Sequence, residues 1–214
     1  RKVSMYDLDG LTKTMLIKDM VGRDPSTFYQ REKVPIGETV FEVRNVTGNG
    51  AENISFVLRK GEILGIAGMV GSGRSELMNV LFGSSRLESG EILIRGKTVK
   101  HASPRAAIKN KMCFITEDRQ KTGLFLPQSI AQNVTIANLV NTKKFVVRQA
   151  DDSRTGDKFV KLLNIKTSDS RTLAINLSGG NQQKVVLAKW LTTTGEIFIF
   201  DEPTLGIDVG SKQE

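Results

Sequence analysis

The sequence contains one cysteine, one histidine and only 6% aromatic residues among its 214 positions. Cys113 has no second cysteine with which to form an internal disulfide, and one histidine leaves almost no ligands for a histidine–cysteine metal site. The apolar runs are short and are interrupted by glycine or charge, so no segment is predicted to span a membrane. These shortages argue against disulfide-stapled, zinc-binding and membrane-spanning proteins.

The remaining composition is that of a globular protein, with 39% hydrophobic and 25% charged residues. The formal net charge of +8 is compatible with nucleic acid, anionic lipid or nucleotide phosphates as partners, and equally with a solvated basic surface. Charge alone does not choose among them.

Short strand patterns alternate with helical patterns along most of the chain. Alternating or compact apolar segments bounded by glycine or polar residues predict strands, and amphipathic segments that follow capping residues or glycine predict helices. The predicted strands are 41–46, 54–59, 62–68, 90–96, 112–116 and 196–200, and the predicted helices are 11–21, 75–82, 103–110, 129–140, 153–164 and the segment after 177. This alternation predicts an α/β fold with a mainly parallel core sheet.

The segment GMVGSGRS, residues 68–75, lies between a predicted strand and a predicted helix and has the spacing of a phosphate-binding P-loop. Its glycines allow backbone N–H groups to converge on phosphate oxygens, and the start of the helix adds positive charge. Arg74 stands where that motif has lysine, and the hydroxyl of Ser75 is a candidate Mg²⁺ ligand. The predicted nucleotide-binding residues here are Gly68, Gly71, Ser72, Gly73, Arg74, Ser75 and Glu76.

An acidic pair follows the predicted strand in IFIFDEP, residues 197–203. Asp201 is predicted to hold Mg²⁺ through a water, and Glu202 is predicted to be catalytic by polarising the attacking water. Taken alone, the pair is equally compatible with two solvated acids at a strand end.

A second glycine-rich helix start occurs in LSGGNQQK, residues 177–184. Ser178, Gly179 and Gly180 open this helix and make a second candidate anion site. Packing requirements alone do not readily explain two helix starts suited to binding phosphate together with one acidic strand end in this order.

These motifs resemble those of the ATP-binding cassette (ABC) ATPases, a family of P-loop NTPases. LSGGNQQK resembles the family signature, and DEPTLGIDVG resembles its Walker B strand end and D-loop. KDMVGRD, SPRAAIKN and TEDRQKTGL narrow the resemblance to the second cassette of double-cassette ATPases of bacterial sugar importers, of the ribose, galactose, arabinose and xylose kind.

The resemblance implies a domain organisation. Residues 1–39 are expected to be the end of a preceding cassette and a linker, and residues 40–214 a nucleotide-binding domain that stops after the D-loop. Within it, an antiparallel β subdomain and a helical signature subdomain of about 118–190 are expected to flank the parallel sheet.

The resemblance also implies ATP and Mg²⁺ as cofactors and assigns further roles. Two cassettes, in one longer chain or a homodimer, sandwich two ATP molecules, so Ser178, Gly179 and Gly180 cap the ATP of the partner cassette. Asp208 corresponds to the D-loop aspartate, and Glu117 is a predicted catalytic residue at the Q-loop position, near Mg²⁺ and the attacking water. Membrane permease subunits and, indirectly, a sugar-binding protein are the implied partners, on the cytoplasmic face of the bacterial membrane, with no nucleic acid.

Three departures from the family pattern modify these expectations. Arginine replaces lysine at position 74, and Glu117 stands where glutamine is usual. No aromatic residue occupies the adenine-stacking place just before residues 51–56, where the chain reads TGNG, which leaves Phe41 as a weak candidate. Both charged substitutions are typical of second cassettes, and they predict a site that binds MgATP but hydrolyses it slowly. An importer of nucleosides, a non-transport ABC ATPase acting on nucleic acid, and a non-catalytic cassette are the alternatives.

Overall fold

A computed structural model describes residues 4–7, 9–21, 34–100, 102–141, 148–207 and 212. Among these residues, no helix is both long enough and apolar enough to cross a bilayer. The strands are β1 (Thr39–Gly48), β2 (Ala51–Arg59), β3 (Ser89–Ile94), β4 (Lys97–Val99), β5 (Met112–Ile115) and β6 (Ile197–Phe200). The helices are α1 (Lys13–Val21), α2 (Arg74–Phe82), α3 (Pro104–Lys109), α4 (Ile130–Thr135), α5 (Gln149–Leu162) and α6 (Gly179–Leu191), with short turns η2 (Arg119–Gly123), η3 (Ile136–Asn141) and η4 (Ala174–Asn176).

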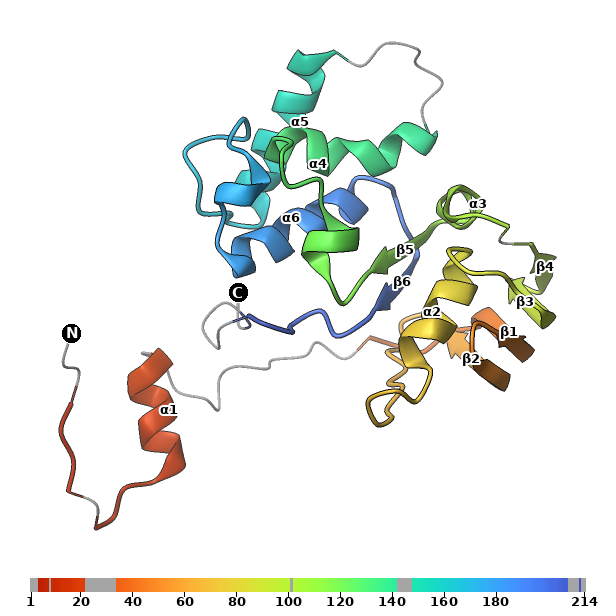
Figure 1. Ribbon diagram of the computed structural model, residues 1–214, viewed down its shortest axis with the longest axis horizontal. Helices are drawn as coiled ribbons and strands as arrows, with labels where there is room; N and C mark the ends of the chain where they lie inside the picture. The colour runs from red at the N-terminus through yellow and green to blue at the C-terminus, as the bar shows by residue number, and fades with distance from the viewer. Residues whose placement is uncertain are drawn as a thin grey trace.

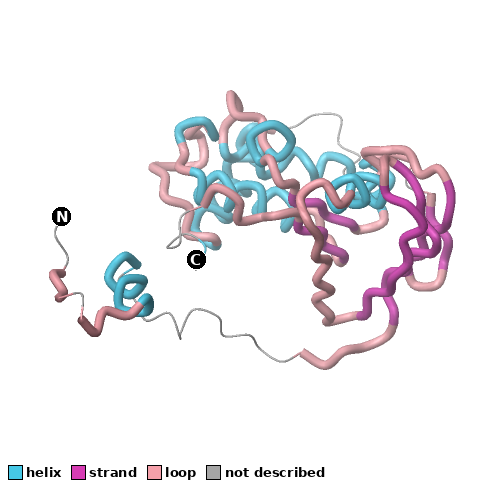
Figure 2. Tube along the Cα trace, turned by 60° about the horizontal axis from the view of Figure 1, so that its bottom comes forward, coloured by secondary structure: helices cyan, strands magenta, loops and turns pink. Residues whose placement is uncertain are grey.

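The four strands β1–β4 form an antiparallel sheet in the order β2-β1-β3-β4, which curves around one end of the molecule (Figure 2). In β1, Phe41 and Val43 are buried two residues apart, as the period of a half-buried strand requires. Phe41 is paired with Leu58 on one side and Ile94 on the other. The predicted strands at 41–46, 54–59 and 90–96 are therefore confirmed.

Strands β5 and β6 pair in parallel, with Ile115 opposite Phe200. All four residues of β5 are buried, as expected for a strand covered on both faces. Figure 1 shows this pair between the helices α4–α6 on one side and α2 with the antiparallel sheet on the other, whereas α1 lies apart.

The predicted strand at 62–68 is wrong in this structure, because residues 62–69 have no assigned strand or helix. Apolar composition made the segment look like a buried strand, but a strand also needs a neighbour for its N–H and C=O groups, and neither β5 nor β6 pairs with it. Its side chains are correspondingly open, with Ile63 75% exposed and Ile66 39% exposed. The parallel sheet among the described residues is thus smaller than predicted.

The predicted helices are present, with changes at their ends. Ser103 caps α3 through its hydroxyl, which accepts from the Ala106 N–H, and Pro104 occupies the first turn. The segment 129–140 divides into α4, which starts with a capping box between Ser129 and Gln132, and the 3₁₀ turn η3. Helix α5 starts at Gln149, earlier than predicted, and the loop predicted at 117–128 contains the π-helical turn η2.

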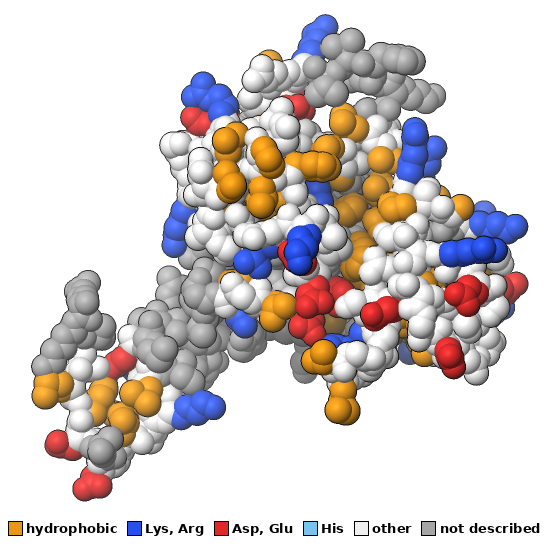
Figure 3. Space-filling view, in the orientation of Figure 1, with side chains coloured by type: hydrophobic (Ala, Val, Ile, Leu, Met, Phe, Trp, Pro, Cys, Tyr) orange, Lys and Arg blue, Asp and Glu red, His pale blue; other side chains and the backbone are white. Residues whose placement is uncertain are grey.

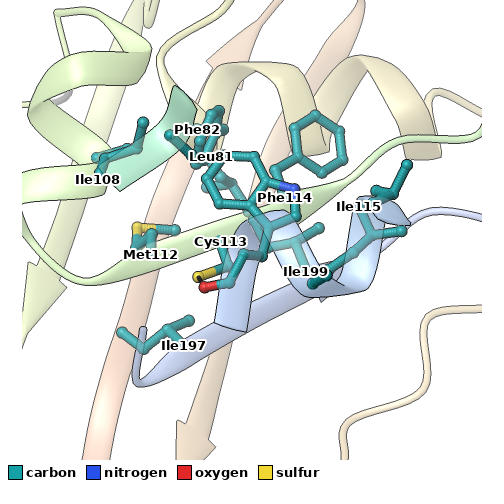
Figure 4. Packing of buried hydrophobic residues seen from close by; sticks show 14 of the residues in the cluster. Leu81, Phe82, Ile108, Met112, Cys113, Phe114, Ile115, Ile197 and Ile199 are labelled. Atoms are coloured by element: carbon teal, nitrogen blue, oxygen red, sulfur yellow. Dashed lines mark hydrogen bonds between the residues drawn. The ribbon is translucent and has the colours of Figure 1, made fainter. Parts of the chain in front are cut away.

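One core joins the helical part to the sheets. Phe82 of α2 is 4% exposed and lies between Phe114 of β5 and Trp190 of α6, with ring centroids 5.4 Å and 5.6 Å away. Figure 4 shows Leu81 and Phe82 facing the β5 residues, with Ile197 and Ile199 of β6 packed beside them. The helix after the glycine-rich loop and the acidic strand end are therefore anchored in the same core.

Candidate functional site

The glycine-rich loop, residues 68–75, leads directly into α2. Gly71 and Gly73 have φ angles of +82° and +84°, a region that residues with a side chain avoid. Gly73 is the residue before the first turn of α2. At Gly68 the reason for glycine is space, because an added methyl group would overlap the hydroxyl of Ser72. The loop therefore needs glycine at these positions for two different physical reasons.

The start of α2 presents free backbone donors. Within the described part of the chain, the N–H groups of Gly73, Arg74 and Ser75 have no backbone acceptor, whereas the Ser72 N–H donates to Met69 O and the Leu77 N–H to Gly73 O. Unpaired donors at a helix start, together with the helix dipole, favour an anion. The loop thus fits a phosphate group, as its sequence predicts.

Arg74 does not point away into solvent. Its Nη2 lies 2.9 Å from Oε1 of Glu202, and the two side chains are 28% and 39% exposed. Glu202 has a φ of +42°, an uncommon conformation for a residue with a side chain, directly after the end of β6. This ion pair links the glycine-rich loop to the acidic strand end, 128 residues further along the chain.

The acidic strand end lies level with the end of β5. The Asp201 N–H donates to Ile115 O at 2.9 Å, and Asp201 is buried, 8% exposed. Because parallel strands carry their carboxyl ends to one edge, the exposed Glu117 follows β5 at the same edge of the sheet. On the face drawn in Figure 3, acidic and basic side chains gather where the helical part meets the sheets.

A cavity of about 1200 Å³ brings several predicted residues together. Arg74, Asp201 and Glu202 all line it, next to apolar side chains of α2, β6 and the unpaired segment before the loop. Glu117 is not among its lining residues. Ser75 and Glu76 lie in the first turn of α2, with Ser75 partly buried and the Glu76 side chain exposed.

The donor set is compatible with a magnesium–nucleotide complex. The Ser75 hydroxyl and the Asp201 carboxylate are oxygen ligands of the kind that Mg²⁺ prefers, and Mg²⁺ bound to phosphates needs only one or two protein ligands. The described residues contain no group of three or more acidic, histidine or cysteine side chains able to hold a metal ion by themselves. The side chains present therefore fit Mg²⁺ carried by phosphate.

The second glycine-rich helix start does not line this cavity. Ser178, Gly179 and Gly180 begin α6, and none of them lines the cavity beside Arg74. The Ser178 hydroxyl accepts from Asn181 Nδ2 at 2.9 Å and does not cap a backbone N–H. Asp208, predicted to act with this region, lies outside the described residues.

The adenine-stacking candidate is wrong. Phe41 is 2% exposed, and its ring packs against Phe56 with the centroids 6.2 Å apart. Phe41 borders the cavity beside Arg74, but a ring this deeply buried has almost no accessible face for a nucleotide base. The alternating pattern of β1 already placed this side chain on the buried face of the strand.

Two residues near the site were not singled out by their sequence pattern. Arg119 Nη1 donates to Leu205 O at 2.9 Å, and Lys189 Nζ donates to Gly123 O at 2.6 Å. Burial lowers the pKa of Lys189 to about 8. The run of charged residues EDRQK, directly after β5, was a sequence feature that could have pointed to Arg119. Nothing in the sequence distinguishes Lys189 from an ordinary helix residue.

Comparison with known proteins agrees with these motifs. Residues 51–205 match the family model described as ABC transporter. The ribose import ATP-binding protein RbsA of Bacillus cereus is 45% identical over 201 residues, which is 93% of this chain and 40% of that protein. RbsA of Bacillus subtilis is 43% identical over 201 residues, 93% of this chain and 41% of that protein.

A protein of Rhizobium johnstonii, named for ribose/galactose/methyl galactoside import, is 44% identical over 217 residues, which is 100% of this chain and 42% of that protein. The chain therefore spans about two fifths of the length of these relatives.

Solved structures share the fold. The ATP-binding cassette MJ0796, in a dimeric structure bound to ADP and Pi, has a TM-score of 0.66 at 18% identity, covering 80% of this chain and 77% of that one. A nucleotide-free ATP-binding cassette has a TM-score of 0.68 at 19% identity, covering 82% and 73%. The predicted fold class is thereby confirmed, and the chain belongs to the ABC transporter family.

Proposed function

We propose that this chain is the ATP-binding and ATP-hydrolysing part of a bacterial sugar importer. The observation that carries the proposal is the ion pair at 2.9 Å that joins Arg74, at the end of the glycine-rich loop, to Glu202, beside Asp201 in one cavity. The import of ribose and related sugars named for its relatives supplies the substrate class. The working protein would be longer than this chain and peripheral on the cytoplasmic face of the membrane, where permease subunits and, through them, a sugar-binding protein complete the importer.

Each part of the site has a defined task in this proposal. The N–H groups of Gly73, Arg74 and Ser75 bind phosphate oxygens, and the Arg74 guanidinium adds a positive charge. Ser75 and Asp201 hold Mg²⁺, which neutralises phosphate charge when it is bound with ATP. Glu202 orients the attacking water and accepts its proton.

The ion pair between Arg74 and Glu202 supports slow hydrolysis. A carboxylate bound to a guanidinium at 2.9 Å has one oxygen already engaged as a hydrogen-bond acceptor. Phosphate must compete with Glu202 for Arg74 before Glu202 is free to act on water.

The position of the signature residues supports a two-cassette arrangement. These residues, Ser178, Gly179 and Gly180, do not line the cavity beside Arg74, and we assign a phosphate held at the start of α6 to the ATP of the partner cassette. A second cassette, in the same longer chain or in a second copy, would bring its own loop to α6. ATP turnover would then need both cassettes.

The test uses the full-length importer in which the first cassette is inactivated at its own catalytic glutamate. Arg74→Lys combined with Glu117→Gln should raise single-site ATP turnover by about tenfold, because the lysine releases Glu202 and the glutamine removes a competing charge. The affinity for a fluorescent ATP analogue should stay within about threefold.

The matched control is Arg171→Lys, since Arg171 forms an exposed ion pair with Asp169 away from the site. This variant should leave turnover unchanged. Unchanged turnover in the double variant would contradict the proposal that Arg74 and Glu117 slow ATP hydrolysis at this site. Failure of the wild-type protein to bind MgATP at all would contradict the proposed function, and uptake of nucleoside but not ribose into vesicles would replace sugar as the solute.

A further inference from the structure

Arg119, the first residue of η2, reaches two other segments of the site with one guanidinium. Its Nη1 donates to Leu205 O at 2.9 Å, in the turn after the acidic strand end. Its Nη2 lies against Gly179, where an added Cβ would be only 2.7 Å from this nitrogen. The arginine thus lies between the loop after β5, the start of α6 and the turn after β6.

The loop itself is firmly attached to α6. Gln120 Nε2 donates to Gln182 Oε1 at 3.0 Å, and Lys189 Nζ donates to Gly123 O. Gln182 and Lys189 are buried, 3% and 9% exposed. The Asp118 carboxylate accepts from the N–H groups of Gln120 and Lys121 and fixes the turn from its own side. Two side-chain hydrogen bonds therefore join η2 to α6.

The attachment of η2 to the acidic strand end depends on a long, planar, two-ended side chain. Arginine can place one nitrogen at Leu205 O and another beside Gly179, whereas lysine has a single amino group. Arg119 Nε is buried and has no hydrogen-bond partner among the described residues. Burying a polar atom without a partner is unfavourable, so the contacts made by the ends of the guanidinium, the hydrogen bond to Leu205 O and the close approach to Gly179, are what favour this position.

We propose that Arg119 is a positioning residue that couples the loop 116–123 to both halves of the ATP chemistry. Through Gly179 it acts on the signature that serves the partner cassette, and through Leu205 on the turn that follows Asp201 and Glu202. Displacement of the loop then moves both together. This inference rests on the proposed function, because it assigns to the loop the control of ATP turnover.

The test compares Arg119→Ala and Arg119→Lys in the full-length importer, with Lys121→Ala as the matched control on the same turn. The Lys121 side chain is 84% exposed, and the ion pair that it forms among the described residues is with the neighbouring Asp118. Hydrogen exchange without nucleotide is measured at residues 178–182 and 204–207. ATP turnover gives kcat and KM separately, and a fluorescent ATP analogue reports affinity.

Arg119→Ala should speed exchange at residues 204–207 by about tenfold, the size expected for loss of a hydrogen bond from a charged donor. It should also speed exchange at residues 178–182, where the guanidinium packs against Gly179. It should lower kcat by about tenfold or more while KM and affinity stay within about twofold. Arg119→Lys should restore the wild-type exchange rate in one segment only. Lys121→Ala should change neither the exchange rates nor kcat.

Several results would overturn the proposal. For Arg119→Ala, these are unchanged exchange rates in both segments, a changed rate in only one segment, or a kcat equal to that of the wild type. For Arg119→Lys, the result is wild-type exchange rates in both segments. If Arg119→Ala does not fold, the lysine variant decides alone, because it keeps the charge and removes only the second end. If the wild-type protein hydrolyses no ATP, the proposed function fails, while the exchange data still decide whether Arg119 couples the segments.

Discussion

Gly71→Ala isolates the backbone requirement of the glycine-rich loop. Gly71 has a φ of +82°, and an added Cβ would meet no atom within 4 Å. Gly65 has the same open surroundings without a left-handed φ. Gly65→Ala is therefore the matched control, because both variants add one methyl group to the same segment and only one adds backbone strain.

The magnitude follows from the difference between the two positions. Alanine in the left-handed region costs about 1–2 kcal/mol. Both substitutions also stiffen the unfolded chain, which stabilises the folded state by about 0.4–1 kcal/mol. The second effect cancels in the comparison, so Gly71→Ala should lose about 1–2 kcal/mol relative to Gly65→Ala, or roughly 5- to 30-fold in an equilibrium constant.

The loss is measured by two assays on the same full-length proteins. If the loop stays in its present conformation, Gly71→Ala lowers the free energy of unfolding in urea. If the loop relaxes without nucleotide, the same cost reduces the affinity for a fluorescent ATP analogue, because binding restores the strained conformation. The two losses should sum to the stated difference. Equal behaviour of the two variants in both assays would refute the conformational requirement at Gly71.

Two further predictions concern the core that supports the site. Phe82→Ala should lower the free energy of unfolding by about 3–5 kcal/mol in urea, whereas the 57% exposed Phe125 should tolerate alanine within about 0.5 kcal/mol; similar losses in both variants would contradict the packing described here. Burial lowers the pKa of Lys189 from 10.5 to about 8, so the unfolded chain binds this proton more tightly and stability should rise between pH 8 and 10.5. Lys189→Met should remove that rise, of up to about 3 kcal/mol, and a rise that persists in the variant would refute the assignment.

Some elements of this fold could be predicted from the sequence and others could not. Strands β1–β3 and the capped helix α3 were predictable because their alternation and capping residues act locally. The conformation of segment 62–68 was not predictable, because its apolar residues form a strand only when another strand pairs with the segment. The π-helical turn η2 was missed for a related reason, because its side chains reach α6 and the turn after β6 rather than their neighbours in sequence.

The sequence by itself determined the chemistry of the site. Glycine spacing, a helix start and an acidic pair after an apolar strand are local patterns that, taken together and in this order, predict a site for phosphate and Mg²⁺ without any tertiary contact. Only the tertiary structure decided how these groups meet. It joined Arg74 to Glu202 across the fold, and it set Arg119 between Gly179 of α6 and the turn after β6. Such contacts depend on how the core orients distant segments, and no spacing along the chain records that orientation.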